Sequence, residues 1–321
     1  AICSYIDTTG DRSILYDGAF EVIIECARFY VSRSVFIPLK KRYELWDVLG
    51  PDEYHERVNN NAYTNRMALF TIDTALEYIE KIQKEADDEL LLVLKKMDIR
   101  EEISLMKDVS QKMYIPQVSD LLVERSTGME NIIPQFDGYF TLEDCSLDIL
   151  KKRLIDPNEY WGGTGIASET QIIKQADAII LMNLFPDEYS DEIMKANFSY
   201  YISRTEHGSS LSACMYALLA CQIKNTETAY SLFRKTAEVD LRGDGKQYAG
   251  LVYIGGTHPA ASGGAYLSVV QGFCGLRIKN AEISLSPSLP ETWEEVSFKI
   301  KVMGQMFKIC VTKKEKIICR I

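Results

Sequence analysis

The sequence lacks several features that define common classes of protein. No apolar run approaches the length of about 18 residues that a transmembrane helix requires, so we expect no membrane association. It contains neither a phosphate-loop lysine signature nor a dinucleotide fingerprint. Basic residues are not in excess, because 36 Lys and Arg against 46 Asp and Glu give a net charge of −10. An acidic chain repels phosphate backbones, so nucleic acid is not an expected partner.

Metal-binding and disulfide patterns are also missing. No two cysteines have CxxC spacing, no histidine stands at zinc-finger spacing, and no second cluster accompanies Asp52, Glu53 and His55, so we expect no metal. Several cysteines fall in apolar helical stretches, where free thiols are usually buried. Free thiols and the absence of a visible signal peptide together predict a cytoplasmic location. The cysteines are Cys3, Cys26, Cys145, Cys214, Cys221, Cys274, Cys310 and Cys319.

Residues 1–274 have mainly the period of amphipathic helices. Phe20, Ile23, Ile24 and Ala27 recur at spacings of three and four, which places them on one helix face. The same period, with Pro, Gly and Asp in the connections, predicts a mainly α chain. The further helices are expected over 62–82, 86–96, 98–113, 168–183, 188–203, 211–222, 226–239 and 266–273.

The period changes after Gly275, and residues 275–321 are predicted to form a small β domain. Apolar and polar residues alternate over 296–302 and again over 307–311, with a turn at 304–305 between them. A second pair of strands is expected around 281–285 and 316–321. Four short strands make a thin sheet, which needs a covering layer from the helical region or from further protein.

The segment before the helix at 62–82 could carry acid chemistry. Gly50 and Pro51 break any preceding helix, and the asparagines at 59–61 offer helix caps, so Asp52 and Glu53 fall on a loop. Cleavage of a glycosidic bond needs a carboxylic acid to protonate the departing oxygen, and a partly buried glutamate can keep its proton near neutral pH. Glu53 is the candidate for this acid. The alternative is an ordinary acidic capping turn.

Three other segments offer ligand-binding groups. Gly208-Ser209-Ser210 precedes an apolar helix, where free N–H groups and the helix dipole favour an anion such as phosphate. Glycine pairs at 255–256 and 263–264 bracket His258 and permit close backbone approach to a ligand. Lys174-Gln175-Ala176-Asp177 offers partners for sugar hydroxyls or an anion. Each segment also has an ordinary structural interpretation. The serines could only cap the helix, the glycine pairs could form a flexible connector, and residues 174–177 could be a solvated helix face.

The histidines link these segments. The sequence has three, His55, His207 and His258, and each falls in a Gly-, Ser- or Pro-marked loop before a predicted helix. Loops that precede successive helices are found at the rim of a helical barrel. Their shared position favours one common site.

Together these motifs resemble glycoside hydrolase family 65, the family of maltose, kojibiose, nigerose and trehalose phosphorylases. The stretch 43–65, with Gly50-Pro51-Asp52-Glu53-Tyr54-His55, is similar to the acid motif of that family. The remaining matches, in the same order along the chain, are 135–140, 174–177, 207–212, 263–264 and 272–273.

The resemblance implies an (α/α)6 barrel over 1–274, incomplete at its N-terminus, and a C-terminal β-sandwich over 275–321. It implies inverting phosphorolysis of an α-glucosidic disaccharide to β-glucose 1-phosphate and glucose, by a homodimer, with inorganic phosphate as co-substrate and no cofactor. The implied roles are a general acid for Glu53, glucosyl binding for Lys174 and Gln175, phosphate binding for Ser209, Ser210 and His258, and support of that loop for His207.

Two alternatives remain open at this stage. A hydrolase of the trehalase type would need a second carboxylate near the serine and histidine loops, and Glu206 is the candidate. The other alternative is an inactive folded fragment that only binds sugar. The family's N-terminal β-sandwich and the Trp-Asp motif of its glucose pocket have no counterpart here, so the chain is expected to be the C-terminal part of a longer enzyme, inactive alone.

Overall fold

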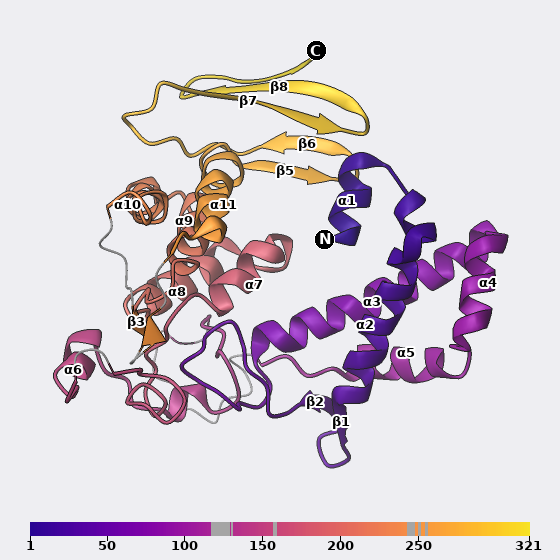
Figure 1. Cartoon of the computed structure of the whole chain (residues 1–321), viewed down its shortest axis with the longest axis horizontal. Coiled ribbons are helices and arrows are strands. Elements are labelled where there is room, and N and C mark those ends of the chain that lie inside the picture. Colours follow the sequence, from indigo (N-terminus) through magenta and orange to yellow (C-terminus); the bar gives the residue numbers. More distant parts are fainter. Residues whose placement is uncertain (117–128, 130, 157–158, 243–247, 250–251, 254–255) are drawn as a thin grey trace.

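The computed structural model describes residues 1–116, 129, 131–156, 159–242, 248–249, 252–253 and 256–321 (Figure 1). The α-helices are α1 (Ile2–Thr9), α2 (Phe20–Arg33), α3 (Ala62–Glu85), α4 (Asp88–Met97), α5 (Glu102–Lys112), α6 (Leu147–Lys151), α7 (Ala178–Leu184), α8 (Asp191–Ile202), α9 (Ser212–Gln222), α10 (Thr226–Ala237) and α11 (Pro259–Leu267). Shorter helical turns are η1 (Leu15–Ala19), η3 (Tyr139–Thr141), η4 (Pro186–Glu188) and η5 (Ser268–Phe273). The strands are β1 (Ser34–Ile37), β2 (Arg42–Leu45), β3 (Tyr248–Ala249), β4 (Val252–Tyr253), β5 (Leu276–Lys279), β6 (Glu282–Leu285), β7 (Glu295–Val302), β8 (Gln305–Thr312) and β9 (Lys316–Arg320).

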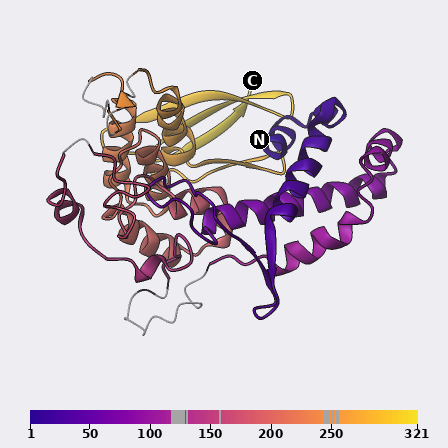
Figure 2. The same cartoon turned by 60° about the horizontal axis from the view of Figure 1, so that its bottom comes forward.

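The helices form two groups beneath a layer of strands. Helices α2 to α5 make one group and α7 to α11 the other, while β5 to β9 lie across the top of the second group in Figure 1 and remain on that side in Figure 2. Helix α3 contacts α2, α5 and α7, so it joins the two groups. Within the described ranges, no helix has both the length and the apolarity to cross a membrane.

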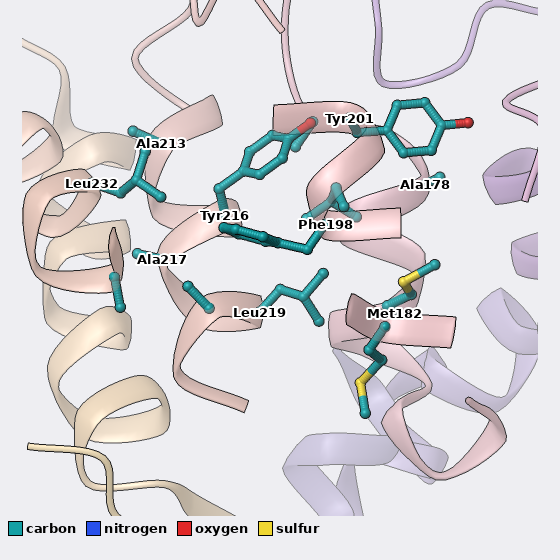
Figure 3. Packing of buried hydrophobic residues seen from close by; sticks show 14 of the residues in the cluster. Ala178, Met182, Phe198, Tyr201, Ala213, Tyr216, Ala217, Leu219 and Leu232 are labelled. Carbon is teal, nitrogen blue, oxygen red and sulfur yellow. The ribbon is translucent and has the colours of Figure 1, made fainter. Parts of the chain in front are cut away.

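The larger hydrophobic core lies where α7, α8, α9 and α10 meet. Tyr216 and Leu219 of α9 are fully buried and pack beside Met182 of α7 and Phe198 of α8, as Figure 3 shows. Burial of an aliphatic or aromatic side chain of this size stabilises the fold by about 1.5–3 kcal/mol. Helix α9 is therefore buried almost all round, and the loop in front of it is held on a rigid support.

The predicted amphipathic helix near residue 20 is confirmed. Helix α2 buries Phe20, Ile23, Ile24 and Ala27 against α3 and α5. Helix α3 also begins where the asparagine run predicts, because the Asn61 side chain accepts a hydrogen bond from the backbone N–H of Thr64 at 2.8 Å.

Two helix predictions are wrong in extent. The expected helix over 168–183 begins only at 178, because the backbone before it is bonded to other segments: the N–H of Gln171 donates to the carbonyl oxygen of Glu143, and that of Ile173 to the carbonyl oxygen of Arg204, both at 2.9 Å. The helix expected from 266 already begins at Pro259, with His258 as its N-cap. Gly263 and Gly264 therefore lie inside α11 and do not form a loop around a ligand.

The strands predicted after residue 275 are confirmed, but they pair differently from the prediction. Strand β6 pairs with β5, and β9 extends the β7–β8 hairpin, so the expected pair of 281–285 with 316–321 does not form. The hairpin turn consists of Met303 and Gly304, which both have positive φ (49° and 75°), one residue earlier than expected. Val270 and Cys274, at the end of the helical region, pack with Ile309 and Val311, so the helices supply part of the covering layer.

The cysteines are free, and half of them are buried. Cys145, Cys214, Cys221 and Cys274 are buried, whereas Cys26 and Cys319 are exposed and Cys3 and Cys310 are intermediate. The prediction of buried thiols is therefore confirmed for four cysteines and wrong for the exposed Cys26 and Cys319.

The two glycines of α11 give a matched test of helix packing. A Cβ on Gly264 would lie 2.6 Å from Sγ of Cys214 in α9, whereas nothing lies within 4 Å of a Cβ on Gly263. We expect Gly264→Ala to lower the free energy of unfolding by about 1–3 kcal/mol through overpacking. Gly263→Ala should raise it by up to about 1 kcal/mol, since alanine favours helix. Urea denaturation of both variants checks this, and equal effects would contradict the packing described.

Candidate active site

Glu53 lies on the loop between β2 and α3, as expected. Its carboxylate forms an ion pair with the ammonium of Lys174. The carbonyl oxygen of Glu53 accepts a hydrogen bond from the Tyr160 hydroxyl at 2.9 Å. A Cβ on Gly162 would lie 2.7 Å from this oxygen, so the close approach of the two loops requires glycine there. The side chain of Glu53 is 46% exposed and that of Lys174 16%, so the carboxylate can meet a ligand.

The carboxylate of Asp52 fixes the backbone on both sides of this ion pair. Asp52 is fully buried, and its Oδ1 accepts hydrogen bonds from the backbone N–H of Lys174 at 2.7 Å and of Tyr54 at 3.3 Å. Its Oδ2 contacts Nδ1 of His55 at 2.7 Å and accepts from Nε2 of Gln135 at 3.1 Å. One side chain therefore ties the acid loop to the Lys174 segment.

His55, in the same loop, is buried and does not line the cavity that contains Ser209 and Ser210. Its Nε2 is 2.7 Å from the backbone carbonyl oxygen of Thr170, which can only accept, and its Nδ1 faces the Asp52 carboxylate. Burial lowers the pKa of His55, but the hydrogen bond and charge of Asp52 outweigh it, so the pKa is raised above its usual value. His55 and Asp52 thus form a buried ion pair that supports Glu53.

Asp177 is the second buried carboxylate of this network. Its Oδ2 accepts hydrogen bonds from the backbone N–H of Asp52 at 3.2 Å, Nδ2 of Asn61 at 3.2 Å and Nε2 of Gln135 at 3.3 Å. Burial raises the pKa of Asp177 to about 7, and the charge of Asp52 acts in the same direction. The carboxyl therefore changes charge near neutral pH.

Lys174 and Gln175 lie between two loops. One is the loop of Glu53, and the other is the loop of His207 before α9. The side-chain amide of Gln175 donates to the carbonyl oxygen of Pro51. The carbonyl oxygen of Lys174 accepts from the N–H of Gly208 at 3.1 Å, and that of Ile173 accepts from Glu206 at 2.9 Å. These hydrogen bonds hold the loop after residue 204 beside Lys174, the residue whose side chain contacts Glu53.

His207 supports the loop in front of α9. The residue has a positive φ of 55°, and its Nδ1 lies 2.8 Å from Oγ of Ser212. Its ring packs edge-on against Tyr216 at 5.0 Å between centroids. Burial, with a smaller effect from the charge of Lys235, lowers the pKa of His207 to about 4. Its imidazole is therefore neutral at neutral pH. Ser209 and Ser210 follow directly.

His258 comes from a different part of the chain. As N-cap of α11 it donates its backbone N–H to Oδ2 of Asp240 at 2.7 Å, and its Nδ1 lies 2.6 Å from Oδ1 of the same carboxylate. Asp240 lay outside every motif singled out in the sequence, so its contact with His258 was not predicted.

One cavity brings most of the expected residues together. It has a volume of about 900 Å³ and is lined by Lys174, His207, Ser209, Ser210 and His258, together with residues of α10. Glu53 and Gln175 are not among its lining residues; Glu53 meets it through its contact with Lys174. In the part of the chain that the structure describes, no group of His, Cys, Asp and Glu could hold a metal ion.

The supporting residues differ from what the sequence predicted. Asp177 was expected to be a partner for sugar hydroxyls or an anion, but it is fully buried and does not line the cavity. Asp52 and Gln135 lay inside the quoted motifs, yet nothing in the sequence showed that they contact one another. Tyr160 and Gly162 lay outside every motif. Only their position over Glu53 reveals their function, since they contact its backbone and not its side chain.

Comparison with known proteins identifies the family. Residues 1–266 match the glycosyl hydrolase family 65 central catalytic domain, and residues 276–320 match the C-terminal domain of the same family. The chain therefore belongs to glycoside hydrolase family 65.

The relatives are phosphorylases by name. The chain is 46% identical to the nigerose phosphorylase of Lachnoclostridium phytofermentans, over 100% of this chain and 42% of that protein. It is 40% identical to the 1,2-alpha-glucosylglycerol phosphorylase of Bacillus selenitireducens, over 98% of this chain and 40% of that protein. A solved structure described as a candidate kojibiose phosphorylase from the human microbiome superposes with a TM-score of 0.83 at 27% identity, over 100% of this chain and 40% of that one. The chain thus spans about two fifths of the length of these relatives.

The raised pKa of Asp177 predicts how stability depends on pH. The folded state holds a proton on Asp177 up to about pH 7, whereas the unfolded carboxyl loses it near its ordinary value of 3.8. Stability from this group is therefore greatest below about pH 4 and is lost as pH rises to about 7.

Asp177→Asn should flatten this dependence. Between pH 4 and pH 7 the free energy of unfolding of the wild type should fall by about 1–3 kcal/mol more than that of the variant. Denaturation at several pH values measures it. Parallel curves for the two proteins would show that Asp177 keeps an ordinary pKa.

Proposed function

We propose that this chain carries the acid and the phosphate site of an inverting phosphorylase that acts on an α-glucosidic disaccharide. The products are β-glucose 1-phosphate and glucose. The observation that supports this most directly is the contact of Glu53 with Lys174 at the edge of a cavity that also contains Ser209, Ser210 and His258. The names of the relatives point to the same class of reaction.

In the proposed mechanism Glu53 protonates the bridging oxygen while phosphate attacks the anomeric carbon from the opposite face. An inverting hydrolase needs a second carboxylate to activate water. Phosphate is itself an anionic nucleophile, so groups that bind it replace that base. Ser209 and Ser210 donate to phosphate from the start of α9, and His258 contacts it from α11.

The glucosyl unit is held by the segment that also holds the acid loop. Lys174 and Gln175 bind sugar hydroxyls, and His207 keeps the serine loop in place through Ser212. Because the ammonium of Lys174 contacts the carboxylate of Glu53, a sugar hydroxyl bound by Lys174 lies next to the acid. The reaction uses no cofactor besides phosphate as co-substrate.

The hydrolase alternative finds no support in the geometry. Glu206 lines the cavity, but its carboxylate accepts a hydrogen bond from the Tyr54 hydroxyl. Tyr54 is buried among Trp161, Ile172 and neighbouring residues, so this contact holds the carboxylate toward the protein. One oxygen of Glu206 is thus already engaged, and the contact orients the side chain toward Tyr54.

We further propose that the helices belong to an (α/α)6 barrel and that a domain boundary lies near residue 275, where η5 ends and β5 begins. The paired helices α2–α3 and α9–α10 are the units such a barrel requires. A homodimer is the proposed assembly.

The experiment that tests the function measures glucose 1-phosphate released from nigerose, kojibiose, maltose and trehalose by the intact protein that carries this chain. Product that requires inorganic phosphate supports phosphorolysis. Free glucose at the same rate without phosphate would overturn it in favour of hydrolysis, and absence of turnover with every sugar would favour a sugar-binding protein.

Glu53→Gln should lower kcat of the intact protein by about 10²–10⁴-fold, because a positioned general acid contributes that much and glutamine cannot donate the proton. Glu56→Gln is the matched control: Glu56 lies three residues along the same loop, faces Gly163 and lines a separate cavity of about 520 Å³. Steady-state rates of both variants are compared. Equal losses, or none for Glu53→Gln, would remove Glu53 as the acid.

A further inference from the structure

The cavity beside Glu53 is lined by more basic side chains than the proposed phosphate site uses. Three basic side chains of α10 and the turn after it line the cavity in addition to those already described. The basic lining residues within the described part of the chain are Lys174, His207, Arg234, Lys235, Arg242 and His258. A positive charge that no carboxylate already compensates attracts a phosphate dianion more strongly, so we compare the partners of these side chains.

Both arginines already have a carboxylate partner. Arg234 lies 2.7 Å from Glu238, and Arg242 forms an ion pair with the other oxygen of the same carboxylate. This cluster is self-compensated, since one guanidinium flanks each side of Glu238. The charge of each guanidinium is therefore compensated by a carboxylate of Glu238 at the end of α10.

The other candidates are likewise occupied or uncharged. Lys174 is paired with Glu53, and His258 with Asp240 at 2.6 Å. His207 is neutral at neutral pH, because burial lowers its pKa to about 4. It can donate or accept a hydrogen bond but supplies no positive charge.

Lys235 differs from all of these. It forms no ion pair with any carboxylate in the described ranges, although it lines the cavity with Ser209 and Ser210. Burial and the positive charge of Lys151 lower its pKa, while Glu206 acts in the opposite direction. The carboxylate of Glu206 is itself held by Tyr54. Lys235 therefore presents a positive charge that an arriving anion would stabilise.

We propose that Lys235 is a phosphate-binding residue of this site, contacting the anion from α10 while Ser209 and Ser210 contact it from the start of α9. The assignment rests on the proposed phosphorolysis and adds a residue to it. Lys174 pairs with Glu53 before phosphate arrives, so Lys235 supplies the charge that first attracts the anion. It acts on phosphate and not on the sugar.

The test is a comparison of kinetic constants in the intact protein. Lys235→Gln should raise KM for inorganic phosphate about tenfold and leave KM for the disaccharide within about twofold, because a charge-assisted hydrogen bond to one substrate is lost. Lys235→Arg keeps the charge and should restore KM for phosphate to within about threefold of wild type. Titration calorimetry with inorganic phosphate should show the same order of affinities.

Arg234→Gln is the matched control, since Arg234 is the adjacent residue of α10 and is already paired with Glu238. It should leave KM for phosphate within about twofold. If wild type is phosphate-dependent and Lys235→Gln keeps KM and phosphate affinity unchanged, the role of Lys235 is wrong and the proposed function stands. If wild type turns over without phosphate, the proposed function and this assignment both fail.

Discussion

The site depends on the buried carboxylate of Asp52. Four groups converge on it: the backbone N–H of Lys174, the backbone N–H of Tyr54, the ring of His55 and the amide of Gln135. Glu53 stands between the residues that this carboxylate holds. The acid and its lysine partner are thus brought together by a residue that contacts neither side chain, and the geometry of the acid follows from that of Asp52.

Charge compensation explains why this arrangement is tolerated in the interior. A buried carboxylate without a partner is strongly destabilising, but Asp52 faces the imidazole of His55 and accepts several hydrogen bonds. Asp177 has amide and backbone donors only, so burial raises its pKa to about 7. On the cavity side most cations have partners already. The buried charges are therefore compensated, whereas the positive charge of Lys235 in the neighbouring cavity has no carboxylate partner among the described residues.

Local patterns in the sequence predicted the local structure well. The period of three and four predicted α2, and the asparagine cap predicted the start of α3, because both depend on residues adjacent along the chain. The position of Glu53 on a loop was predicted in the same way. Contacts between residues far apart in the sequence could not be predicted. No helix forms before residue 178 because Glu143 and Arg204 bind the backbone of Gln171 and Ile173, and residue 264 must be glycine because Cys214 lies against it. The network of Asp52, Gln135 and Asp177 required the fold for the same reason.

The central claim is that Asp52 positions Glu53 and Lys174 for catalysis. The most direct measurement is kcat and KM of Asp52→Asn in the intact protein, with folding verified by circular dichroism at the assay temperature. Asparagine cannot stabilise the charged ring of His55 and turns an amide toward donors, so the loop is held less firmly. We predict a kcat at least about tenfold lower, as expected when a positioning contact is lost, with KM for phosphate changed by less than about threefold. A folded Asp52→Asn variant with the kcat of wild type would contradict the account.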